Sequence, residues 1–223
     1  MSLIGDTLSW LGNGAHWSGA DGVPHRLLVH LGLSAAAVGL AALVALPVAV
    51  LLGHARWRFG GAVIAVANAT RAVPVLGLLI ILASTSLGLS TRSTVIALTV
   101  FAVPPLLTNA FLGVRDVDRD VVEAARGNGM SGLQVLRSVE LPLALPLMAA
   151  GLRTSAVQVV ATATLAAYVG GGGLGQFINE GFARGDQAET AAGGLLVAVL
   201  AVLVELLLAL LQRRLEPPVE TRL

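Results

Sequence analysis

The chain has 223 residues, of which 56% are hydrophobic and only 12% are charged, and its formal net charge is +1. A water-soluble domain of this length could not remove so much apolar surface from water, so the composition predicts an integral membrane protein. The small net charge gives no electrostatic reason to expect a nucleic-acid partner. The absence of cysteine excludes disulfides and thiolate metal sites, and the four histidines lack metal-ligand spacing, so we expect neither a metal nor a cofactor.

The first 26 residues mix glycine and polar side chains with Trp10 and Trp17, and they contain no basic stretch followed by a long apolar run. This pattern does not fit a cleavable signal peptide. Tryptophan favours the membrane–water interface, so residues 1–26 are predicted to form a segment along the membrane surface.

Five apolar segments are long enough to cross a hydrocarbon core, which takes about 20 helical residues. The predicted spans are 27–52, 61–83, 94–114, 143–169 and 191–211. They predict one all-α membrane domain over residues 27–211, followed by a tail over residues 212–223. His30, one turn inside the first span, is interpreted as an interfacial histidine rather than a ligand.

The arginines indicate how the spans are oriented, because short cytoplasmic loops retain positive charge. Nine arginines follow the first, third and fifth spans, and three lie at the other ends. The first group is Arg56, Arg58, Arg115, Arg119, Arg126, Arg137, Arg213, Arg214 and Arg222; the second is Arg26, Arg92 and Arg184. We therefore expect the N-terminus outside the cell and both the loop 115–142 and the C-terminus in the cytoplasm.

The loop contains the densest polar stretch of the chain, "EAARGNGMSGLQVLRSVELP", residues 123–142. Asp120 and Glu123, like Ser131 and Gln134, have the spacing of a capping box, which satisfies free amides at the start of a helix. The "RGNG" between them suits a left-handed turn. These patterns predict two short helices joined by a glycine turn, although a solvated amphipathic loop is the alternative for such a charged segment.

Pro142 lacks an amide hydrogen and disfavours helix in the residue before it. The second short helix is therefore expected to stop before Pro142 and to continue through a rigid elbow into the fourth span. A stiff element connected in this way could transmit a push to the membrane helix.

The same stretch resembles the EAA loop of binding-protein-dependent ABC importer permeases. The matching residues are Glu123, Ala124 and Ala125, then after three residues Gly129, then after nine residues Val139, and after one more Leu141 and Pro142. Valine stands here where that family often has isoleucine. In the family this loop is the coupling helix that docks on the ATP-hydrolysing subunit.

The resemblance implies a type I ABC importer permease in the bacterial cell membrane. By this match, Glu123, Ala124, Ala125 and Gly129 would form the docking surface and its turn, while Leu141 and Pro142 would set the elbow. The implied partners are cytoplasmic ABC ATPase subunits, an extracytoplasmic solute-binding protein, a second permease chain, identical or paralogous, and the lipid bilayer. The chain itself contains neither a G-x-x-x-x-G-K-[ST] motif nor any lysine, so it is not expected to hydrolyse ATP.

Two further stretches, "TRAVPVLGLL" at 70–79 and "TLAAYVGGGGLGQFI" at 164–178, are similar to the osmoprotectant branch of that family, which imports glycine betaine, carnitine, choline or proline. Arg71 stands where that branch often has an uncharged residue. A permease for another small solute, such as an amino acid or a thiol, is the nearest alternative, and an ion-coupled carrier or channel is the next. A membrane enzyme would need a nucleophile, base and metal constellation, which is missing.

A stripe of small and polar residues follows one face of the fourth span: Gly151, Ser155, Gln158 and Thr162. Such a stripe lines a solute pathway or forms a helix-packing seam, and the sequence leaves both open. Tyr168 stands near the expected outer mouth and is a further pathway candidate.

Arg71, Arg153 and Glu205 lie inside predicted spans, where each would cost about 2.5–3.5 kcal/mol at mid-helix unless it pairs, snorkels or faces water. Arg153 and Glu205 have comparable depth, so an ion pair between them is geometrically possible. Such a pair could be static or could act as a gate. Pro74 and the pair Pro104-Pro105 are expected to kink the second and third spans.

Overall fold

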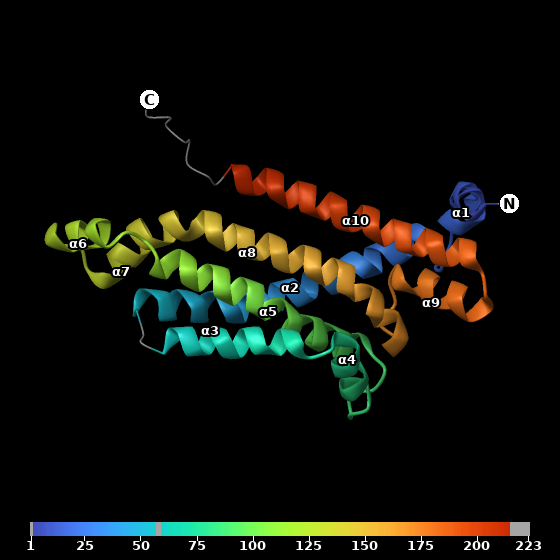
Figure 1. Ribbon diagram of the computed structural model, residues 1–223, viewed down its shortest axis with the longest axis horizontal. Helices are drawn as coiled ribbons and strands as arrows, with labels where there is room; N and C mark the ends of the chain where they lie inside the picture. Colours follow the sequence, from blue (N-terminus) through green and yellow to red (C-terminus); the bar gives the residue numbers. More distant parts are fainter. Residues whose placement is uncertain (1, 57–58, 215–223) are drawn as a thin grey trace.

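The computed structural model describes residues 2–56 and 59–214, and the regular elements in these two ranges are all helical. The prediction of an all-α protein is confirmed. The long helices form one elongated bundle, with α6 (Arg119–Gly127) and α7 (Gly132–Val135) at one end and α1 (Leu3–Gly12) and α9 (Gly175–Arg184) at the other (Figure 1). Most of the tail predicted at 212–223 lies outside the described residues.

The N-terminal segment is shorter than predicted, because α2 (Val23–His54) already begins at Val23. Before it, α1 is capped by Ser2 and is followed by the short 3-10 helix η1 (Gly14–Trp17). Trp17 is exposed, as expected for an interface anchor. Trp10 is only partly exposed and packs against other residues of the chain. Its ring stacks on His16 at 4.0 Å between centroids.

The centre of the bundle is formed by α2, α5 (Thr91–Arg115) and α8 (Leu141–Thr162). On α2, alanine recurs every fourth residue and all four members are buried: Ala37, Ala41, Ala45 and Ala49. They belong to one core cluster with Leu106, Ala110 and Phe111 of α5. Small side chains at this spacing let two helices approach closely, as is common in membrane proteins.

The interfacial interpretation of His30 is wrong. His30 is fully buried, and its Nε2 lies 2.9 Å from the carbonyl oxygen of Val160 on α8. The sequence placed this residue one turn inside the span but could not show that α8 covers it.

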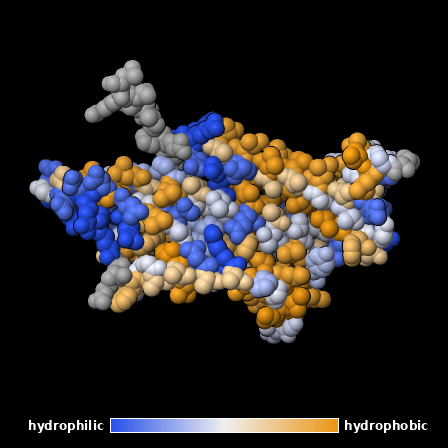
Figure 2. Space-filling model, viewed as in Figure 1, coloured by the Kyte–Doolittle hydropathy of each residue, from blue (hydrophilic) through white to orange (hydrophobic). Residues whose placement is uncertain are grey.

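The apolar surface of α10 (Gln187–Arg213) remains largely exposed, as expected for a helix that faces lipid. Four helical stretches in the described ranges are long and apolar enough to cross a membrane, and a fifth span results if one bent pair is counted. Hydrophobic side chains cover the flank of α10, and hydrophilic ones gather at the α6–α7 end (Figure 2).

The bend predicted at Pro74 in the second span is present, and it breaks the span into two helices instead of kinking one. The span consists of α3 (Gly60–Ala69), the 3-10 turn η2 (Thr70–Ala72) and α4 (Val75–Ala83), with a bend of 81°. Val73 is extended, with φ −73° and ψ 123°, as favoured by the proline that follows it. By contrast, α5 continues through Pro104 and Pro105 without a break.

The predicted elbow before Pro142 is also wrong. The helix runs from Gly132 to Val169 through α7, a π-helical turn η3 (Leu136–Glu140), α8 and the 3-10 turn η4 (Ala163–Val169). A π turn closes its hydrogen bonds over five residues and so shifts the register. Pro142 removes one amide hydrogen where this π turn passes into α8, and the helix continues through it.

Candidate functional site

The loop that resembles the EAA loop folds into two capped helices, α6 and α7. The predicted cap of α6 is wrong by two residues, because Asp118 precedes the helix and its Oδ1 accepts a hydrogen bond from the Asp120 amide at 2.9 Å. The predicted capping box of α7 is confirmed. Ser131 Oγ accepts from the Gln134 amide at 3.4 Å, and Gln134 Oε1 accepts from the Ser131 amide at 2.7 Å.

The turn between α6 and α7 depends on Gly129, the only residue between them with a positive φ, at 84°. The Gly129 amide donates to the carbonyl of Arg126 at 2.9 Å, and the Met130 amide donates to that of Ala125 at 3.3 Å. This pair of bonds is a Schellman motif, which ends a helix at a left-handed residue. The predicted glycine turn is therefore confirmed.

The two helices enclose a small apolar core of their own. Val117, Val122, Ala125 and Val135 are buried in it, and Met130 and Val139 pack against them. Of the three residues that begin the matching motif, Glu123 and Ala124 are exposed while Ala125 faces this core. The segment is thus a folded unit rather than a solvated loop, and its exposed face carries Glu123 and Ala124.

A part-buried polar contact ties this unit to the end of α2. His54 Nδ1 donates a hydrogen bond to the carboxylate of Glu140, whose exposed fraction is only 1%. Arg56 Nη2 also donates to the carbonyl of Val117 at 3.3 Å. Sequence reasoning missed both contacts, since no spacing rule brings together residues 86 and 61 positions apart.

The predicted stripe on α8 divides into two parts. Gly151 packs so closely on α5 that a Cβ there would lie 2.8 Å from Asn109 Cβ, and Ser155 Oγ donates to the carbonyl of Ala102 at 2.9 Å. Both residues are buried in the seam between α5 and α8. Gln158 and Thr162 are half-buried, and Thr162 Oγ1 donates within its own helix to the Gln158 carbonyl.

The three ionisable residues of the predicted spans have different surroundings. Arg153 Nε lies 3.4 Å from Glu205 Oε1, so the pair expected between α8 and α10 is present. Arg71 lies in η2 at the break of the second span, is exposed, and makes no hydrogen bond or ion pair with the described residues. Tyr168 in η4 is half exposed.

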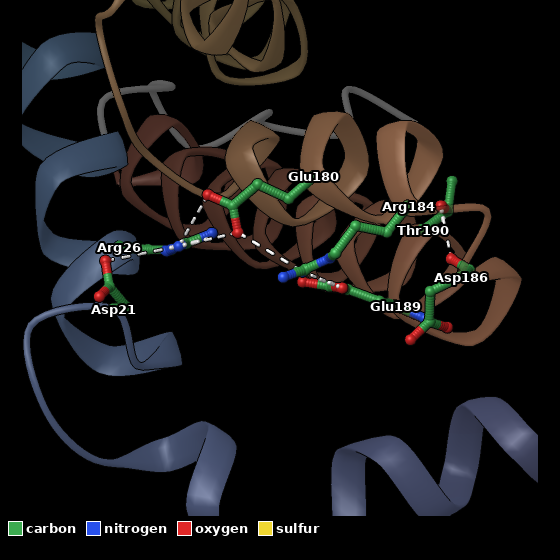
Figure 3. A network of polar contacts seen from close by, with 7 residues as sticks. All are labelled: Asp21, Arg26, Glu180, Arg184, Asp186, Glu189 and Thr190. Carbon is green, nitrogen blue, oxygen red and sulfur yellow. Dashed lines mark hydrogen bonds and ion pairs between the residues drawn. The ribbon is translucent and has the colours of Figure 1, made fainter.

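At the end of the bundle opposite α6 and α7, a polar network joins α2 to α9 and α10 (Figure 3). Arg26 is buried, and its Nη2 donates to both carboxylate oxygens of Glu180 at 3.0 and 3.1 Å. Arg184 bridges Glu180, at 3.7 Å, and Glu189. Asp186 accepts from the Glu189 amide at 3.0 Å and so caps α10.

This network lines a cavity of about 580 Å³ together with Trp10 and His16. The Arg26 guanidinium lies 4.3 Å from the centre of the Phe177 ring, a distance that allows a cation–π contact. The sequence did not reveal this arrangement, because Arg26 and Glu180 are 154 positions apart. The network fixes the beginning of α2 against the α9–α10 hairpin.

Known proteins resemble the chain over most of its length. The carnitine transport permease protein OpuCB of Listeria monocytogenes is 40% identical, over 86% of this chain and 89% of its own length. The glycine betaine/carnitine/choline transport system permease protein OpuCB of Bacillus subtilis is 35% identical, over 84% and 86%.

The fold is shared with a chain of the MetNI methionine ABC transporter, solved in inward-facing conformations. The TM-score is 0.75 at 23% identity, over 87% of this chain and 96% of the other. The family model described as "Binding-protein-dependent transport system inner membrane component" matches residues 45–220. The chain is therefore a multi-pass membrane protein with a type I ABC importer permease fold. It belongs to the family of inner membrane components of binding-protein-dependent transport systems.

Proposed function

We propose that the chain is the permease subunit of an ATP-driven importer for osmoprotectants such as glycine betaine, carnitine, choline or proline. The observation that carries this proposal is the identity of 35–40% to permeases named for carnitine, glycine betaine and choline transport. In the working transporter, two permease chains meet in the membrane. ATPase subunits bind on the cytoplasmic side, and a solute-binding protein delivers the solute outside.

The α6–α7 unit is the element on which the ATPase subunit would act. Its own core and its Schellman turn make it stiff, and the hydrogen bond between His54 and Glu140 fixes it to α2. The docking face would carry Glu123 and Ala124, while Ala125 supports it from within. Leu141 and Pro142 lie in a continuous helix, so a push on the unit would pass directly into α8.

The proposed function is tested by uptake in a bacterial host that lacks its own osmoprotectant importers. The chain is expressed with its cognate ATPase and binding protein, and radiolabelled carnitine, glycine betaine, choline and proline are supplied separately. We expect uptake of at least one of them, and its loss when the phosphate-loop lysine of the ATPase is replaced by alanine. Transport of an amino acid or a thiol instead would change the solute assignment. Uptake by the chain alone, without ATP, would support the alternative of an ion-coupled carrier or channel.

The proposed orientation places residues 1–26 outside and loop 115–142 and the tail in the cytoplasm, as the arginine distribution favours. The cysteine-free chain allows a direct test with two exposed serines, Ser18 and Ser138. We expect a membrane-impermeant maleimide to label Ser18→Cys in intact spheroplasts expressing the permease alone. Ser138→Cys should react only after lysis. The reverse labelling pattern would show the opposite orientation, in which the α6–α7 unit lies outside the cell and cannot bind a cytoplasmic ATPase.

A further inference from the structure

The break between α3 and α4 exposes a stretch that lipid could not cover. Residues 71–74, with the sequence Arg-Ala-Val-Pro, are all exposed, and the chain bends here by 81°. Irregular backbone at membrane depth is tolerated only where protein or water covers it, because lipid offers no hydrogen-bond partners. This surface must therefore face either another protein chain or a water-filled space.

The length of helix before Arg71 indicates that this residue lies near the middle of the membrane. It is eleven residues beyond Gly60 (71 − 60), where α3 begins beside Phe111 at the α6–α7 side of the bundle. Eleven helical residues rise about 16 Å, roughly half of a hydrocarbon core of about 30 Å. A guanidinium at this depth needs an anion or water nearby.

No carboxylate within the described part of the chain meets this need. Glu205 is the one acidic residue inside a predicted span, and it already pairs with Arg153 at 3.4 Å. The nearby polar residue Asn68 is also engaged, since its Nδ2 donates to Thr108 Oγ1 at 3.3 Å. An identical second chain would carry the same pairs, so it would have no free carboxylate at this depth to offer Arg71.

We propose that Arg71 faces the solute pathway between two permease chains and binds the carboxylate of the passing solute. This inference rests on the proposed function. The guanidinium of Arg71 is exposed and has no hydrogen-bond or ion-pair partner among residues 2–56 and 59–214, and its planar fork matches the two oxygens of a carboxylate. The chemical class of ligand is a zwitterion with a carboxylate and a quaternary ammonium group.

The proposal separates solutes that are otherwise similar. Carnitine and glycine betaine carry a carboxylate, whereas choline carries an alcohol in its place. The contact with Arg71 therefore assists carnitine and glycine betaine but not choline, although all three present the same cationic group. Choline serves as an internal control for the assembly and the motor of the transporter.

The experiment measures uptake of carnitine and choline by the complete transporter in proteoliposomes, with the unaltered binding protein saturated by each solute. In Arg71→Gln, we expect the ratio of carnitine to choline uptake to fall roughly ten-fold or more, as the loss of a charged hydrogen bond implies. Arg71→Lys keeps the charge but loses the planar fork, so its ratio of carnitine to choline uptake should lie between those of the wild type and Arg71→Gln. Arg92→Gln, which removes an exposed arginine at the start of α5, should leave the ratio unchanged.

Several results would overturn the assignment. An equal loss of both solutes in Arg71→Gln, with or without loss of copurifying ATPase, would give Arg71 a role in assembly or folding. An unchanged ratio, or a wild-type transporter that carries choline alone, would also contradict it. If the wild type carries only carboxylate-bearing solutes, Arg71→Gln must lose uptake and Arg71→Lys must partly restore it. A wild type that transports none of these solutes refutes the proposed function itself.

Discussion

Gly129→Val is expected to abolish ATP-driven uptake while the permease still inserts into the membrane. Valine at a φ of 84° is strained by its β-branched side chain, at a cost of about 1–3 kcal/mol. Apart from Gly129 and its chain neighbours, no atom of the described residues lies within 4 Å of a new Cβ, so the strain comes from the backbone and not from a clash. Relief of this strain would break the Schellman turn, and α6 would then no longer be held against α7.

The measurement combines three readouts for Gly129→Val: the amount in the membrane fraction, the ATPase that copurifies, and solute uptake. Gly127→Ala is the matched control, because Gly127 lies in α6, has no positive φ and also has open space around it. It should retain uptake. Gly129→Asn should retain part of it, since asparagine tolerates the left-handed region. Full uptake by Gly129→Val would show that the turn does not carry the coupling.

His54→Ala is expected to lower the free energy of unfolding by about 1–3 kcal/mol, the cost of leaving the buried Glu140 carboxylate without its hydrogen-bond partner. The carboxylate of Glu140 is almost fully buried, and no other hydrogen-bond partner for it is found among the described residues. The loss would be measured as a lower unfolding midpoint of the purified permease in detergent, together with its yield.

The control for His54→Ala is His25→Ala, which removes an exposed histidine at the start of the same helix. Adding Glu140→Leu to His54→Ala should recover much of the stability, because an apolar side chain needs no partner in this position. If His54→Ala were no more destabilising than His25→Ala, the pair would not hold the α6–α7 unit to α2.

The sequence predicted the spans because hydropathy and length encode them locally, but it could not predict which prolines break a helix. Pro105 is buried where α5 packs on Gly151 of α8, and the helix continues through it. Pro74 is exposed, and there the helix ends. The covalent chemistry of the two residues is the same, so the difference lies in packing that a single sequence does not display.

The candidate site was predictable to the same extent. Caps and turns depend on residues three or four positions apart, so the Ser131 capping box and the Gly129 turn could be read from the sequence. The contacts of His54 with Glu140 and of Arg26 with Glu180 depend on which helices become neighbours. Neither could be found from spacing alone.

The uninterrupted helix from Gly132 to Val169 has a mechanical consequence. Its 38 residues span about 57 Å, more than the full thickness of a bilayer with its headgroups. Under the proposed mechanism, the cytoplasmic motor holds one end of a single rod whose other end stands at the opposite mouth. A tilt imposed by the motor then moves the two ends of this helix in opposite directions. The solute pathway therefore narrows on one side of the membrane while it widens on the other.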